Sequence, residues 1–202
     1  MRSATYWQLV VVFSLVMLGM GAVALHRIAA FMDRGLDPRL VAIATALDAG
    51  ASGLTSFAAG LLARRIAPRF IGASGCLLLA VASALTIVAT DYPVMFASMI
   101  VFGMGIGVLI LTQSLVWADY FGRRHLGSIN GMVTPITLIF SAAGAPIAGY
   151  VRDMTGSYTP AWLVAIGLMV VGAAVLAATP SPQTRPSVAP AAPILADDAS
   201  KR

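Results

Sequence analysis

The feature that most constrains this chain is a series of six apolar stretches, each close to the length of a helix that crosses a bilayer. They cover residues 6–25, 40–63, 70–90, 94–117, 127–150 and 161–178. A membrane-spanning helix needs roughly 20 consecutive, mostly apolar residues. Asp91 and Pro93 come just before the fourth stretch. A capping side chain and an early proline favour a helix start there. The pattern predicts an all-α integral membrane protein, with six transmembrane helices in one domain over residues 1–179.

Composition supports lipid as the solvent. The 202 residues are 59% hydrophobic and 10% charged, whereas soluble domains carry about 25% charged residues. The formal net charge is +5, but the arginines stand in small groups between apolar stretches. That spacing suits anionic lipid headgroups better than nucleic acid. We therefore expect the bilayer as a partner and no nucleic acid.

The basic residues predict which side of the membrane each loop faces. Six spans place both termini on one side. On that side lie nine basic residues: Arg2, Arg64, Arg65, Arg69, Arg123, Arg124, Arg185, Lys201 and Arg202. On the other side lie four: Arg27, Arg34, Arg39 and Arg152. Because loops rich in Lys and Arg remain in the cytoplasm, both termini are predicted to be cytoplasmic, in the plasma (cell inner) membrane. Residues 180–202 contain five prolines and predict a disordered, Pro/Ala-rich cytoplasmic tail.

Three loops carry motifs that resemble those of one transporter family. The stretch "GLLARRIAPR" at 60–69 resembles the G-x-L-A-D-R-x-G-R-R signature of the major facilitator superfamily. The stretch "DYFGRRHLG" at 119–127 is similar to the Tyr-Phe and basic-cluster motif of its monocarboxylate and oxalate/formate-type members. "GYVRDMTGSY" at 149–158 resembles the turn before their last helix. The residues that carry the first two motifs are Gly60, Arg65, Arg69, Tyr120, Phe121, Arg123 and Arg124.

The sequence departs from this family in two ways. Arg64 stands where the signature has Asp, and Ala67 where it has Gly. The chain also resembles only the carboxyl-terminal half of such a transporter. The resemblance implies two three-helix repeats that form one half of a twelve-helix fold, and a partner that is a second six-helix half or a copy of this chain. The implied activity is secondary transport of a small organic anion such as a monocarboxylate, by proton coupling or exchange. The alternative is a membrane-embedded structural or regulatory partner, or a truncated remnant, without transport.

Asp48 is the main candidate for a functional side chain. It is the one acidic residue in the stretch 40–63, where a carboxylate costs about 2.5–3.5 kcal/mol on insertion scales. Such a residue marks an ion or solute path, or is held by neighbouring polar groups and water in a structural role. Monocarboxylate-type relatives have an Arg one turn after the corresponding Asp, and here Ser52 occupies that position. The proton site is therefore expected without its usual cation.

Three further residues are candidates for the solute path. Arg27 follows the first stretch and can meet an anion at the mouth of a cavity, although an arginine that extends to the lipid headgroups explains it as well. Gln113, near the inner end of the fourth stretch, can bind a solute or another helix. Asn130 on the fifth stretch is a weaker candidate.

An enzyme is not expected. "GASG" occurs at 50–53 and 72–75 and is similar to the G-x-S-G of rhomboid-type membrane proteases, but that chemistry needs a histidine beside the serine. The last stretch, 161–178, has none. The two histidines, His26 and His125, lie far apart in sequence without a ligand cluster, so no metal is expected. A phosphate-binding G-x-x-x-x-G-K-[ST] loop is missing, so no nucleotide cofactor is expected either.

Overall fold

A computed structural model of the protein describes residues 4–122 and 126–180. The structure is all helical over these residues. Arg123 and Arg124 of the second motif, and residues 181–202 of the predicted tail, lie outside the described residues.

Six long helical segments are apolar enough to cross a membrane, which confirms the predicted six-helix fold. The first segment comprises two helices, α1 and α2, which meet at Leu25. The helices are α1 (Ala4–Ala24), α2 (His26–Asp33), α3 (Pro38–Leu62), α4 (Pro68–Val88), α5 (Tyr92–Phe121), α6 (Leu126–Thr155) and α7 (Thr159–Ala178).

Local sequence explains where several helices begin. Asp37 accepts a hydrogen bond from the amide of Arg39, and Pro38 opens α3. Asp91 accepts one from the amide of Val94, so it caps α5 as predicted. These carboxylates satisfy amides that have no partner within the helix.

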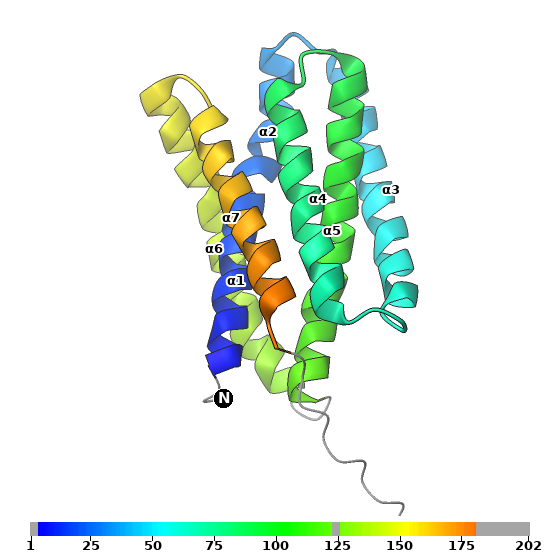
Figure 1. The fold of residues 1–202 in the computed structure, drawn as a ribbon. Helices are drawn as coiled ribbons and strands as arrows, with labels where there is room; N and C mark the ends of the chain where they lie inside the picture. Colours follow the sequence, from blue (N-terminus) through cyan, green and yellow to red (C-terminus); the bar gives the residue numbers. More distant parts are fainter. Residues whose placement is uncertain (1–3, 123–125, 181–202) are drawn as a thin grey trace, which may run out of the picture.

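The helices run up and down in one bundle (Figure 1). The start of α1, the α3–α4 loop and the end of α7 lie at one end, which we call the terminal end; the opposite end is called distal. Because α1 starts and α7 finishes at the same end, the six crossings place both described ends of the chain on one side of a membrane.

Helices of each predicted repeat pack mainly on helices of the other repeat. The first repeat comprises α1 to α4 and the second comprises α5 to α7. In the first repeat, α1 packs mainly on α6 and α7, which belong to the second. In the second, α5 packs mainly on α3 and α4, which belong to the first. Contacts between α4 and α7 join the two groups. This reciprocal arrangement is what two related three-helix repeats should produce.

Glycines allow the helices to approach closely. A Cβ atom on Gly103 would collide with the backbone oxygen of Asp48, and one on Gly107 with that of Ser52. The "GMGIG" stretch of α5 is therefore a packing surface for α3, as small residues at helix interfaces in membranes are.

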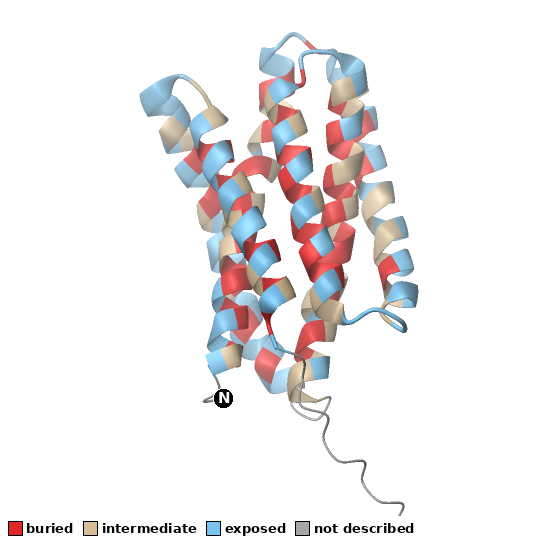
Figure 2. Cartoon of the chain, in the orientation of Figure 1, coloured by how far each residue is buried: buried red, intermediate tan, exposed pale blue. Residues whose placement is uncertain are grey.

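Helices α3 and α6 are the least buried of the membrane-spanning segments. Within an 18-residue window, only 17% of α3 and 22% of α6 is buried, against 50% or more for the α1–α2 segment, α4 and α5. The exposed side chains of α3 include Leu47, Leu54 and Phe57, and Figure 2 shows α3 coloured largely as exposed or intermediate. No other helix among the described residues covers these faces.

Candidate functional site

The most unusual group in the membrane-spanning part is a buried ion pair. Arg27, in the first turn of α2, donates from Nη2 to Oδ2 of Asp48 on α3 at 2.5 Å. Arg27 is 4% exposed and Asp48 is 9% exposed. The position of Arg27 after an apolar stretch suggested that it extends to the lipid headgroups. In the structure its side chain is instead buried within the bundle. Charges are costly in hydrocarbon, and pairing with Asp48 offsets that cost enough for Arg27 to lie inside the bundle.

Two features of the chain bring the pair together. The helical segment that begins with α1 turns at Leu25 and continues to Asp33, which carries Arg27 past α3. Asp48 belongs to the buried stripe of α3, together with Val41 and Ala44. These residues recur at helical spacing, so they share one face.

Helix α5 covers the pair from a third direction. The guanidinium carbon of Arg27 lies 4.0 Å from the ring centroid of Phe102, which is fully buried. Next to it, Gly103 lies so close to Asp48 that an added Cβ would be 2.7 Å from Oδ1. An aromatic face stabilises a cation, while the glycine leaves room for the carboxylate.

Three polar atoms of the ion pair have no hydrogen-bond partner among the described residues. Nε and Nη1 of Arg27 and Oδ1 of Asp48 are buried, and no partner among the described residues binds them. A buried polar group without a hydrogen bond costs free energy. The pair can therefore gain from a ligand that offers both an acceptor to the guanidinium and a donor to the carboxylate, such as a protonated carboxylic acid.

The other predicted path residues lie elsewhere. Gln113 follows Phe102 by 11 residues on α5, about 16 Å nearer the terminal end at 1.5 Å per residue. Asn130 is exposed in the second turn of α6. The structure thus brings Arg27 and Asp48 together but joins neither Gln113 nor Asn130 to them.

Two residues of the loop motifs, Arg69 and Tyr120, bind carbonyl groups at the end of α7. Arg69 donates to the carbonyl of Thr179 at 2.5 Å, and Tyr120 donates to that of Pro180 at 2.7 Å. Phe121 stacks within an aromatic group that includes Trp117. A cation at the C-terminus of a helix is favourable because it faces the carbonyl end of the dipole. Gly60 is half-buried and Arg65 is exposed.

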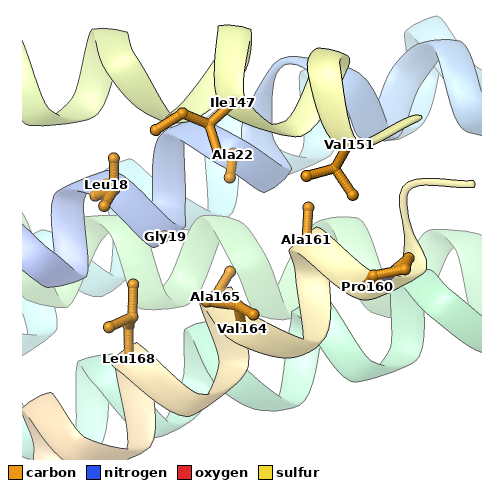
Figure 3. Close-up of a pocket in the computed structure, with 11 residues that line it drawn as sticks. Leu18, Gly19, Ala22, Ile147, Val151, Pro160, Ala161, Val164, Ala165 and Leu168 are labelled. Atoms are coloured by element: carbon orange, nitrogen blue, oxygen red, sulfur yellow. The ribbon is translucent and has the colours of Figure 1, made fainter. Parts of the chain in front are cut away.

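A separate cavity of about 210 Å³ lies between α1, α6 and α7 (Figure 3). The side chains that line it are carbon only and include Leu18, Ile147 and Val164. Its lining offers no polar side chain to orient a charged solute, and neither Arg27 nor Asp48 lines it. The ion pair remains the better candidate.

The sequence made Asp48 and Arg27 separate candidates but did not predict their pairing or the contact of Arg27 with Phe102. A signal was present: two charges in or beside neighbouring apolar stretches each need compensation, so Arg27 and Asp48 were natural partners. Phe102 gave no signal, because aromatic residues are common in apolar helices.

Comparisons with known proteins agree with this fold. The family model of the Major Facilitator Superfamily matches residues 9–197. Monocarboxylate transporter 13 of Bos taurus is 25% identical over 186 residues, covering 89% of this chain and 43% of the relative. Monocarboxylate transporter 13 of Rattus norvegicus is 31% identical over 81 residues, covering 40% of this chain and 19% of the relative. The chain thus spans less than half the length of the curated relatives it matches.

Proposed function

The chain belongs to the major facilitator superfamily, and from that premise we propose that it supplies one half of a secondary transporter for a small organic anion, with a monocarboxylate as the leading substrate class. The observation that carries the proposal is the buried pair of Arg27 and Asp48, because it offers a cation for the anion and a carboxylate for a proton. The relatives named as monocarboxylate transporters support the substrate class.

The ion pair suggests how proton and anion movement are coupled. When a proton binds to Asp48, the carboxyl group becomes neutral and its attraction for Arg27 weakens. The guanidinium is then available to bind the carboxylate of the solute through a charge-assisted hydrogen bond. Release of the solute and the proton on the other side restores the ion pair. In the loaded site the anion replaces the Asp48 carboxylate as the partner of Arg27, so neither the empty nor the loaded site holds an unpaired buried charge, which would be costly.

The second half of the path is proposed to come from another six-helix body, either a different half or a second copy of this chain. The two halves of such transporters are parallel repeats with the binding site between them. The uncovered faces of α3 and α6 suit that contact. Only one wall of such a path is present in the chain itself.

The first test concerns this incompleteness. Reconstituted in liposomes as a monomer, the chain is expected to give no saturable uptake of a radiolabelled monocarboxylate, because one half cannot enclose a path. Uptake should appear only under conditions where crosslinking detects a dimer or where a partner half is added. Saturable uptake by a demonstrated monomer would contradict the half-transporter proposal.

The second test concerns orientation, for which we propose that both chain ends are cytoplasmic in the plasma membrane, on the basis of the excess of basic residues at the terminal end. Cysteines placed singly at Ser157, in the α6–α7 turn, and at Ser128, in the first turn of α6, are expected to react differently with an impermeant maleimide on intact cells. Ser157→Cys should react from outside, and Ser128→Cys only after permeabilisation. The wild type is the control, since its single cysteine, Cys76, is fully buried. The reverse labelling pattern would invert the proposed topology.

A further inference from the structure

A second cavity, separate from the ion pair, opens beside the α3–α4 loop. It has a volume of about 640 Å³ and lies between α3, α4 and α5, with Ala58, Leu78 and Val108 among its lining residues. Cavities of about 300–1,000 Å³ are typical of small-molecule sites. Exposed residues such as Leu61 and Leu62 lie at its border, so the cavity is a groove on the outside of the bundle. We call it the α3–α4 groove.

The interior of the groove is effectively apolar. Two hydroxyl groups line it, and both are already engaged: Thr55 donates to the carbonyl of Ala51 at 2.6 Å, and Ser74 to that of Ile71 at 2.7 Å. From Ile71 to Leu78, the groove follows α4 over about 10 Å at 1.5 Å per residue. These residues belong to helices of membrane-spanning length, so the groove lies at the depth of lipid acyl chains.

The mouth of the groove is basic. Arg64 and Arg65 line it at the terminal end, and both are exposed. Among the described residues, no hydrogen bond or ion pair engages either guanidinium, in contrast to neighbouring Arg69, which binds the end of α7. An apolar groove at acyl-chain depth that opens between two unengaged arginines matches the two parts of an anionic phospholipid, the chain and the phosphate.

We propose that the α3–α4 groove binds an anionic phospholipid from the leaflet at the terminal end, with an acyl chain along α3 and α4 and the phosphate on Arg64 and Arg65. Basic pockets between transmembrane helices bind such headgroups. The proposal does not depend on transport, because it uses neither Arg27 nor Asp48. Arg64 takes part because it provides a second cation next to Arg65 at the mouth.

The test measures lipid binding to the purified full-length chain in detergent, by native mass spectrometry with added phosphatidylglycerol or phosphatidylcholine of identical chains. The wild type should bind phosphatidylglycerol about 10–30-fold more tightly than phosphatidylcholine, since each arginine near an anionic lipid contributes a few-fold. Arg64→Gln with Arg65→Gln should remove that preference. The control Arg39→Gln with Arg152→Gln removes two exposed cations at the distal end and should keep it.

A second pair of variants tests the acyl chain. Ala58→Trp fills the groove without a change of charge and should weaken binding of both lipids, whereas Ala46→Trp, an exposed alanine of α3 outside the groove, should not. Retention of the phosphatidylglycerol preference by the Arg64 and Arg65 double variant would overturn the proposal. So would competition by millimolar inorganic phosphate together with unchanged binding to Ala58→Trp, because the arginines would then bind an anion without a lipid chain.

Discussion

Replacing Asp48 with asparagine is expected to reduce proton-driven accumulation of the solute, in the active assembly with its partner half, to the level reached without a pH gradient. Asparagine keeps the size and polarity of the side chain but cannot take up and release a proton. Arg27 would then remain permanently available to the anion, as it is when Asp48 is protonated. Exchange of solute for solute, which need not release the proton, should therefore survive.

The measurement is uptake into liposomes with and without an imposed pH gradient, and counterflow exchange in the same preparations at matched protein content. Asp33→Asn is the control, because Asp33 is also paired with an arginine, Arg152 at 2.8 Å, but is exposed at the distal end. It should leave both activities unchanged. Equal gradient-driven accumulation by wild type and Asp48→Asn would remove Asp48 from the coupling mechanism.

Replacing Arg27 with methionine is expected to destabilise the fold by about 3–5 kcal/mol, the cost of leaving a buried charge without its partner. A double variant, Arg27→Met with Asp48→Leu, should recover most or all of that stability, since apolar residues of similar volume can replace a buried ion pair without loss. Neither variant should transport an anion. Stability and function should therefore separate in the double variant.

Reversible unfolding in mixed micelles measures the stability, and uptake by the same preparations in liposomes measures the function. Equal stability of the single and double variants would show that Asp48 does not need Arg27. Anion transport by the double variant would exclude the pair from the solute path.

The six-helix fold could be predicted from the sequence because apolar length and charge placement are local properties. Asp91 was recognised as a helix cap for the same reason. The extent of the first helical segment was not recognised. An apolar pattern ends at Leu25, because His26, Arg27 and Asp33 follow, yet the helical segment continues to Asp33. Those polar residues lie in a helix because other helices of the bundle compensate them.

The candidate site could be predicted only in part for a related reason. Asp48 is visible as a charge in an apolar stretch, but its contact with Arg27 depends on how α2 crosses α3. The position of Gly103 against Asp48 depends on the distance between α3 and α5. Helix crossings are set by the packing of whole surfaces, and a linear pattern of residue types does not contain them.

The packing of helices from one repeat on helices of the other has a consequence for folding during synthesis. Helix α1 is synthesised before α2 to α5, whereas its main neighbours, α6 and α7, are synthesised after them. Val16, which α1 buries against Gly172 of α7 in the finished bundle, must be held by lipid or by the insertion machinery until at least about 130 further residues have emerged, several seconds or more at ordinary rates of synthesis. The pairing of Gly21 with α6, where an added Cβ would meet the backbone of Ser141, can form only then. A ribosome that stops after α5 would therefore leave α3, α4 and α5 able to pack together, and α1 in the bilayer without its two main partners.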